Sequence, residues 1–324
     1  MSSRTARSNR SFIISISSRS RGLFKSIPRE AITGYAKQNN ATHIAHGSTG
    51  AGNDQIRFDL IFQTICPQIE IITPIRDLAL SREEEISYLQ QHGVAGVWEK
   101  ARYSINEGLW GTSIGGMETL TSNGVLPEEA FPNQLQETDA EVVDLRFEKG
   151  EPVGLNGTIM TPIDVIKHLN EWGGKYAIGR DVHVGDTIIG IKGRIGFEAS
   201  GPLMLIKGHH LLEKHTLSKQ QLFIKDQMAA FYGSLMHEGQ YLDPVMRNIE
   251  AFLSSSQKNV TGTVEIRLAP YRFQLLGIQS DFDLMQSAVA NYGETNKAWS
   301  AAEVKGFTKI FSNQTKLYYG LKDA

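Results

Sequence analysis

The sequence predicts an α/β nucleotide-binding domain followed by an α+β domain. Three observations lead to this fold class. A short apolar strand runs into a glycine-rich loop and a helix near residue 50, helices and strands alternate around that unit, and antiparallel patterns replace the alternation after about residue 97. Alternating helices and strands are typical of a parallel sheet covered by helices. We therefore expect one domain over residues 1–97, with residues 1–11 disordered, and a second over residues 98–324.

The first domain is expected to read helix, strand, helix, strand. Pro28 can begin a helix, because proline fits the first helical turn, and Asn39–Asn40 ends it. Strands are predicted over residues 42–45 and 69–73, with apolar residues at helical spacing between them. A further helix should begin at the Ser81–Glu84 capping box, turn Ile86 and Leu89 inward, and end in a left-handed Gly93.

The second domain is expected to combine antiparallel strands with isolated helices. Residues 141–147 alternate polar and apolar, and Asn156–Gly157 is a hairpin-turn signal. Residues 264–275 repeat this alternation around a turn at Pro270–Tyr271. A long amphipathic helical region is predicted over residues 219–254.

One helix of this domain is predicted in more detail. It should begin at Pro162 and present Ile163, Ile166 and Leu169 on one face. Gly173–Gly174 should stop it, because glycine is unfavourable inside a helix.

Composition excludes several classes of function. The net charge of −2 gives no overall attraction to nucleic acid or to an acidic membrane, and no apolar run reaches the roughly 18 residues of a membrane span. We expect neither as a partner. The single cysteine, Cys66, cannot form an internal disulfide, which suits the cytoplasm. No metal site is predicted: His237–Glu238 opens like a zinc-protease helix, but Tyr241 replaces the second ligand.

The N-terminal residues differ from the rest of the chain. Seven arginine and lysine residues lie among many serines before the first acid, Glu30. Such a basic, serine-rich and acid-free composition is typical of an organellar transit peptide. A solvated tail or a misassigned start of the coding sequence is the favoured alternative.

The loop HGSTGAGND is the strongest candidate for a binding site. Backbone N–H groups of a glycine-rich turn at a helix N-terminus converge on an anion, although this loop is neither a Walker loop nor GxGxxG. Thr49, Asn53, Asp54 and Arg57 add a hydroxyl, an amide, a carboxylate and a guanidinium within two helical turns. Such a set suits a zwitterionic amino acid. The alternative is that Asp54 only caps the helix and Arg57 is solvated.

The chain resembles the argininosuccinate synthase family. The resemblance runs through AHGSTGAGNDQIRFDL, IITPIRD, REEEI, YSINEGLWGTSIGG, AIGRDVHVGDTIIGIKGRIGFEA, LEKHTL, NVTGTVEIRL and GFTKIF, from about residue 41 to residue 319. It implies a Rossmann-like first domain of the adenine nucleotide alpha-hydrolase type and a synthetase and multimerisation domain. It also implies a cytoplasmic homotetramer that condenses citrulline and aspartate with ATP and Mg²⁺, through a citrullyl-adenylate. Such adenylyl transfer rests on alignment and charge, so no catalytic nucleophile is expected.

The resemblance also implies site residues. The ATP contacts would be Ala45, His46, Gly47, Ser48, Gly50 and Gly52; the aspartate contacts Thr49, Asn53 and Asp54; and the citrulline contacts Ser17, Asn53, Arg57, Ser104, Ser113, Gly185 and Phe197.

Three departures from the family pattern bear on function. No SGGLDTS-type loop, which grips the pyrophosphate of ATP, occurs in the 324 residues, so we expect the nucleotide domain to be incomplete at its N-terminus and ATP activation to be impaired. Gly185 and Phe197 replace a Glu and a Tyr, with Asp186 as a substitute carboxylate. Phe12 replaces a Tyr, whereas Ser17 is kept.

These departures leave alternatives open. The chain is either a ligase with a truncated or mis-started sequence, or a catalytically impaired relative that binds amino acids or assembles with full-length subunits. A tRNA-modifying relative is a third interpretation, but the near-neutral charge and single cysteine do not favour it.

Overall fold

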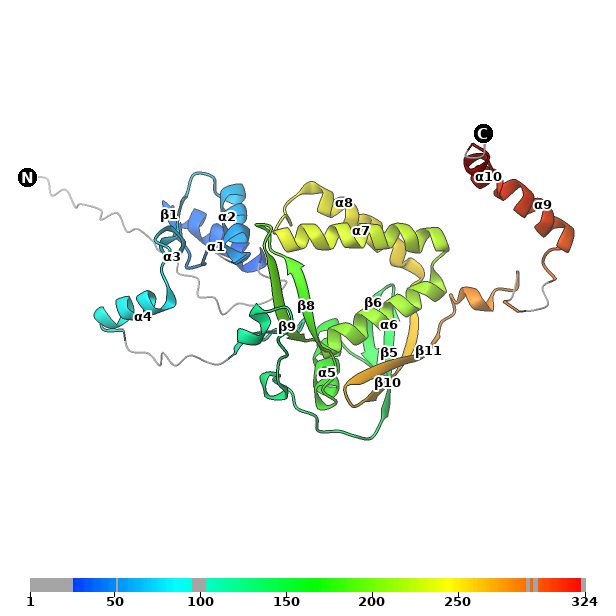
Figure 1. The fold of residues 1–324 in the computed structure, drawn as a ribbon, viewed down its shortest axis with the longest axis horizontal. Coiled ribbons are helices and arrows are strands. Elements are labelled where there is room, and N and C mark those ends of the chain that lie inside the picture. The colour runs from blue at the N-terminus through cyan, green and yellow to red at the C-terminus, as the bar shows by residue number, and fades with distance from the viewer. Residues whose placement is uncertain (1–25, 51, 95–102, 290–291, 294–296, 322–324) are drawn as a thin grey trace, which may run out of the picture.

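The computed structural model describes residues 26–50, 52–94, 103–289, 292–293 and 297–321. The first domain contains the predicted alternation. Helix α1 (Ser26–Gln38), strand β1 (His43–Ala45), helix α2 (Asp54–Ile65) and strand β2 (Glu70–Ile72) follow one another, and β1 pairs with β2 in parallel (Figure 1). The predicted α/β class of this domain is confirmed. The boundary predicted at residues 97 and 98 and the disorder predicted for residues 1–11 lie outside the described residues.

The core of the first domain lies between these elements. Ile44 of β1 and Phe62 of α2 are almost fully buried, and Cys66 packs beside them. Burial raises the pKa of the Cys66 thiol, which keeps this side chain in its unreactive form. The core therefore holds α2 against β1 and fixes the direction in which the glycine-rich loop leaves the strand.

Two short helices complete the first domain. Helix α3 (Pro74–Asp77), which the sequence patterns did not predict, follows β2 directly. Helix α4 (Arg82–Gln91) begins with the predicted capping box, in which Ser81 and Glu84 bond reciprocally, and ends before the left-handed Gly93. Ile86 and Leu89 are half-buried.

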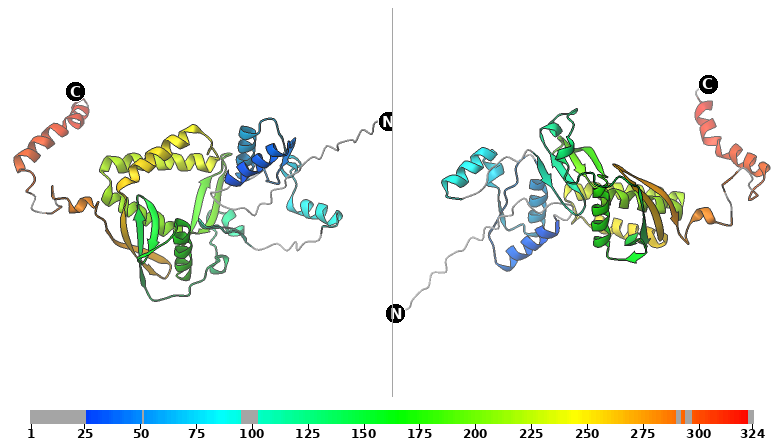
Figure 2. Two further views of the ribbon diagram at one scale, coloured as in Figure 1. Left: turned by 180° about the vertical axis from the view of Figure 1, so that it is seen from behind. Right: turned by 90° about the horizontal axis from the view of Figure 1, so that it is seen from below.

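The second domain is built on a five-stranded antiparallel sheet in the order β11-β10-β5-β6-β7. Its core is apolar and includes Val143, Leu145, Val264, Ile266 and Leu268, all fully buried. Helices α5 and α6 pack against the sheet (Figures 1 and 2). The strands and helices are β5 (Glu141–Glu148), β6 (Glu151–Leu155), β7 (Thr158–Ile159), β10 (Gly262–Ala269), β11 (Arg272–Gln279), α5 (Pro162–Lys175) and α6 (Ser200–Thr216).

Both predicted hairpins are present. Asn156–Gly157 connects β6 to β7 with positive φ at both residues, and Pro270–Tyr271 connects β10 to β11. A second, four-stranded antiparallel sheet has the order β3-β4-β9-β8. Its strands are β3 (Ser104–Asn106), β4 (Thr112–Gly115), β8 (Arg180–Asp186) and β9 (Lys192–Glu198).

Two helix predictions for this domain were wrong in detail. Helix α5 continues through Gly173 and Gly174 to Lys175, because these glycines lie where other elements approach closely. A Cβ at Gly173 would stand 2.5 Å from the Cβ of Ser200 in α6. Tertiary packing outweighs local propensity here. Ile163 is 55% exposed, whereas Val165, Ile166 and Leu169 form the buried face.

The long helical region predicted over residues 219–254 consists of two antiparallel helices. Helix α7 (Lys219–Glu238) ends at Gly239, which has φ of +80°, and α8 (Pro244–Ser256) begins after the Asp243 cap. Helices α9 (Ala301–Phe311) and α10 (Asn313–Gly320) form the C-terminal tail (Figure 2). Short 3₁₀ helices cover Met117–Leu120, Glu128–Ala130, Gln257–Asn259 and Leu284–Gln286. Over the described ranges, every helix is too short or too polar to cross a membrane.

Candidate functional site

The glycine-rich loop leaves the C-terminal end of β1 and enters α2. This is the end of a parallel strand at which α/β proteins place their ligands. Gly47 and Gly50 are exposed, and a Cβ at either position would meet only ordinary side-chain contacts, at 3.8 and 3.9 Å. The protein's own packing therefore does not require glycine at these two positions. Close approach of a ligand to the loop backbone would explain them better.

His46 turns its side chain away from the loop surface into the protein. It is 2% exposed and its ring stacks on Phe58, with the ring centroids 5.2 Å apart. Its backbone N–H donates to the carbonyl of Ile72 in β2 at 3.0 Å. Any contact of His46 with a ligand is therefore limited to its backbone.

A chain of polar side chains backs the loop. The backbone N–H of Ser48 donates to Nδ1 of His46 at 3.3 Å, and Nε2 of His46 lies 2.8 Å from Asp59 Oδ1. Arg76 Nη1 donates to the other oxygen of Asp59 at 2.7 Å, and Arg76 Nη2 donates to Thr73 Oγ1 at 3.0 Å. This chain joins the loop to α2, to α3 and to the end of β2.

The four polar residues predicted to hold an amino acid lie together at the start of α2. Thr49 is exposed in the loop, and the other three are half-buried. Asp54 Oδ1 lies 3.4 Å from Arg57 Nη1, so this acid and this base form an ion pair across one helical turn. Asn53 occupies the cap position of α2, but its side chain does not cap the helix.

Asn53 and Arg57 also contact the second domain. Asn53 Oδ1 accepts from the backbone N–H of Ile188, in the turn between β8 and β9, at 2.9 Å. Arg57 Nε and Nη2 both donate to the carbonyl of His237, at 2.8 and 2.7 Å. The start of α2 therefore meets the end of α7 and the β8–β9 turn (Figure 1).

His237 and Gly239 make this junction possible. The ring of His237 reaches from α7 to the carbonyl of Asp186 at 3.0 Å, and a Cβ at Gly239 would stand 3.0 Å from Cγ of Arg57. Sequence reasoning considered His237 only as a failed metal ligand. The glycine that follows His237–Glu238 was the available signal, because glycine commonly ends helices. The contact with Arg57, 180 positions away, had no local signal.

The second half of the predicted site lies on the four-stranded sheet. Ser113 of β4 stands directly opposite Phe197 of β9, and Gly185 of β8 stands opposite Gly193 of β9. Ser104 of β3 pairs with Gly115, two residues from Ser113. Because side chains alternate along a strand, this register puts the four predicted citrulline residues of this sheet on one face. Gly193 and Phe197 are four residues apart on β9, so Gly185 lies about 13 Å along the sheet from Phe197.

Asp186 lies on the opposite face. It pairs with Lys192, one residue before Gly193, and their charged groups form an exposed ion pair at 2.7 Å. The opposite face also carries Ile114, which is fully buried in a small core. Asp186 is therefore not in place to substitute for a carboxylate at position 185. Ser17 lies outside the described residues.

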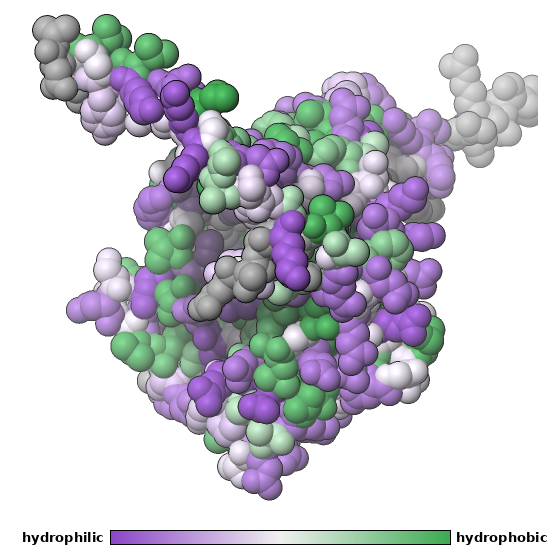
Figure 3. All heavy atoms as spheres, turned by 90° about the vertical axis from the view of Figure 1, so that its right-hand side faces the viewer, coloured by the Kyte–Doolittle hydropathy of each residue, from purple (hydrophilic) through white to green (hydrophobic). Residues whose placement is uncertain are grey.

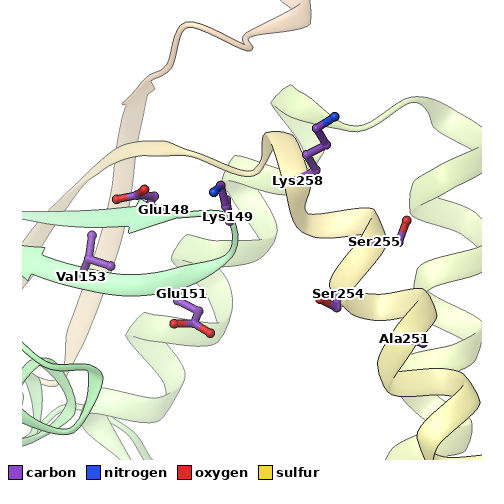
Figure 4. A pocket seen from close by; sticks show the side chains of 8 residues that line it. All are labelled: Glu148, Lys149, Glu151, Val153, Ala251, Ser254, Ser255 and Lys258. Carbon is purple, nitrogen blue, oxygen red and sulfur yellow. The ribbon is translucent and has the colours of Figure 1, made fainter.

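A separate cavity of about 790 Å³ lies between the β5–β6 turn and α8 (Figure 4). It brings together two acids, two lysines, two serines and two small apolar side chains. Its lining residues are Glu148, Lys149, Glu151, Val153, Ala251, Ser254, Ser255 and Lys258. None of the predicted site residues lines it, so it is distinct from the site described above.

The fold of the first domain, with a glycine-rich loop between a parallel strand and a helix, is that of an α/β nucleotide-binding protein. The arginosuccinate synthase N-terminal HUP domain matches residues 17–95, and the arginosuccinate synthase C-terminal domain matches residues 103–318. The chain belongs to the argininosuccinate synthase family, a family of ATP-dependent ligases.

Curated relatives agree over most of the chain. The argininosuccinate synthase of Methanocaldococcus jannaschii is 36% identical over 286 residues, which cover 87% of this chain and 72% of that protein. The argininosuccinate synthase of Dictyoglomus turgidum is 37% identical over 285 residues, with the same two coverages. The argininosuccinate synthase of Methanococcus maripaludis is 33% identical over 291 residues, which cover 88% and 73%.

Proposed function

We propose that this protein condenses citrulline with aspartate to give argininosuccinate, with ATP converted to AMP and pyrophosphate through a citrullyl-adenylate. The observation that carries the proposal is the convergence of acid, base and amide side chains at the start of α2, directly after a glycine-rich loop. In this proposal Asp54 faces the ammonium of aspartate, Thr49 and Asn53 bind its carboxylates, and Arg57 contacts citrulline. Complementary charges at a helix N-terminus suit both a zwitterion and a phosphate.

The remaining contacts are assigned to the loop and the sheet. The loop backbone from Ala45 to Gly52 would hold part of ATP, except for the N–H groups of His46 and Ser48, which donate within the protein. Ser104, Ser113, Gly185 and Phe197 would line the citrulline side of the site, because the strand register gives them one face. Mg²⁺ would bind with the nucleotide, since it usually keeps several waters and needs few protein ligands beside phosphates. We also propose that the first domain comprises residues 1–97 and the second domain residues 98–324.

Exchange of labelled pyrophosphate into ATP, dependent on citrulline, tests the adenylation step. The assay compares the 324-residue chain with a longer chain that carries an SGGLDTS-type segment upstream. Loss of one well-placed donor costs about 10²–10³ in rate, so we expect exchange at least about 100-fold faster with the segment. Equal, measurable exchange by both chains would show that the adenylation step does not require that loop.

The competing function is that of an impaired relative which binds amino acids or joins full-length subunits. The same assay separates the two. If neither chain exchanges pyrophosphate while aspartate still binds the 324-residue chain in calorimetry, the impaired relative replaces the ligase as the better interpretation.

We further propose a cytoplasmic homotetramer in which the C-terminal tail packs against other subunits. Helices α9 and α10 expose large apolar side chains, and Figure 3 shows them projecting from the body of the protein. Phe307, Ile310, Phe311, Leu317 and Tyr318 are each at least 60% exposed. Such a surface on one tail favours burial against a partner. Light scattering should give a mass about four times that of one chain, and a folded monomer at micromolar concentration would contradict the proposal.

A further inference from the structure

The polar chain behind the glycine-rich loop points to positioning residues that the predicted site does not include. We propose that His46, which is buried, and the half-buried Asp59 and Arg76 form an anchor that fixes the backbone of the loop for phosphate binding. The proposal rests on the proposed function for the identity of the ligand. In addition, these three residues would hold the loop in shape before a ligand arrives.

The hydrogen-bond pattern assigns a single role to each nitrogen of His46. Because the Ser48 N–H donates to Nδ1, that nitrogen carries no hydrogen, and Nε2 must carry the one that is donated to Asp59. The ring therefore transmits the position of Asp59 to the backbone of Ser48. With the ring buried and stacked on Phe58, it has little freedom to rotate.

Arg76 holds the far end of the anchor. Its guanidinium binds Asp59 Oδ2 and Thr73 Oγ1, and Thr73, which is 1% exposed, donates in turn to Asp77 at 2.8 Å. Arg76 also lies under the loop, because its Cγ is the nearest atom that a Cβ at Gly50 would meet, at 3.9 Å. Arg76 thus supports the loop by packing under Gly50 and holds the carboxylate of Asp59 by charge.

The anchor also decides which loop atoms face a ligand. The Ser48 N–H is directed inward to His46, so this group is used for shape and not for phosphate. Preorganised donors are worth most when they need no rearrangement on binding. We infer that the residues around Ser48 carry the phosphate contacts, and that the anchor sets their direction.

Two substitutions of His46 separate its two hydrogen bonds. His46→Asn keeps an acceptor at the place of Nδ1, whereas His46→Phe keeps the ring and removes both bonds. His215→Phe is the matched control, because His215 pairs with Asp283 at 3.0 Å in the second domain, away from the loop.

Amide hydrogen exchange of the ligand-free 324-residue chain is the first readout. We expect protection of the Ser48 amide to fall at least tenfold in His46→Phe, which removes both bonds. In His46→Asn, which keeps the acceptor for Ser48 but loses the bond to Asp59, protection should fall by a smaller factor that still exceeds about threefold. Protection should stay unchanged in His215→Phe. Unchanged protection in His46→Phe would overturn the anchor, and parent-like protection in His46→Asn would overturn the part assigned to Asp59 and Arg76.

Calorimetry with ATP and Mg²⁺ is the second readout. Where the parent binds ATP, His46→Phe should weaken that binding at least tenfold, and His46→Asn should weaken it by a smaller factor that still exceeds about threefold. Equal ATP binding by the parent and His46→Phe would overturn the role in phosphate binding. If the parent binds no ATP, the proposed function fails, and the exchange data alone judge whether the anchor exists.

Discussion

The two halves of the candidate site are built in different ways. The loop half, residues 45–57, is continuous in sequence and is held from behind by the hydrogen-bonded chain of His46, Asp59 and Arg76. The sheet half takes Ser104, Ser113, Gly185 and Phe197 from four strands and relies on antiparallel register to put them on one face. Because the loop half is continuous in sequence, it concentrates charge and can be rigid before binding. The sheet half contributes surface from four strands, so its shape depends on the fold of the second domain.

The two halves meet at Arg57. In this structure its guanidinium binds the end of α7 and its neighbour Asn53 binds the β8–β9 turn, so the loop half is connected directly to the sheet half. A guanidinium is well placed at a helix C-terminus, where the helix dipole is negative. Ligand binding at Arg57 should therefore affect the relation between the domains.

The largest expected effect lies in the loop half. Asp54→Ala should weaken aspartate binding by about 2–4 kcal/mol, because it removes the counter-charge for the ammonium. Isothermal calorimetry with the 324-residue chain measures this. Asp164→Ala is the matched control, because Asp164 is also an acid in the first turn of a helix, α5. If both variants lose stability but neither loses aspartate affinity, Asp54 only stabilises helix α2.

A smaller effect is expected where the halves meet. Arg57→Lys keeps the positive charge but cannot reproduce the planar pair of donors that meets the His237 carbonyl. We expect citrulline affinity to fall about tenfold and aspartate affinity to change by less than about threefold, consistent with loss of one charge-assisted hydrogen bond. Arg247→Lys on α8, where Arg247 pairs with Glu250, controls for a general arginine effect. An equal loss for both amino acids would mean that Arg57 shapes the site as a whole and does not contact citrulline selectively.

The same comparison explains what could be predicted from the sequence. The strand, loop and α2 were predicted because their signals are local: apolar residues at fixed spacing and glycines in a turn. Both hairpins were predicted for the same reason. The partners of Arg57 and Asn53 were not, since they lie 180 and 135 positions away and depend on how the domains meet.

Two corrections show where local signals mislead. Gly173 and Gly174 look like a helix stop, yet Gly173 allows the close approach of α6 to α5, and Gly174 allows that of Asn133. Asp186 looks like a substitute carboxylate because it is next to Gly185 in sequence. In a strand, however, neighbours point to opposite faces, and the register of β8 with β9 puts Gly185, not Asp186, on the face of Phe197.

The smallest expected effect tests that assignment of faces. Asp186→Asn removes an exposed charge whose partner is Lys192, and such exposed ion pairs contribute about 0–1 kcal/mol. We expect citrulline affinity to stay within about twofold of the parent. Ser113→Ala, on the other face, should lower it about three- to tenfold, as for the loss of one hydrogen bond. Calorimetry on both variants decides the matter. The reverse pattern, with a large loss for Asp186→Asn and none for Ser113→Ala, would mean that citrulline binds the face that carries Asp186 and that the sheet half of the site is wrongly assigned.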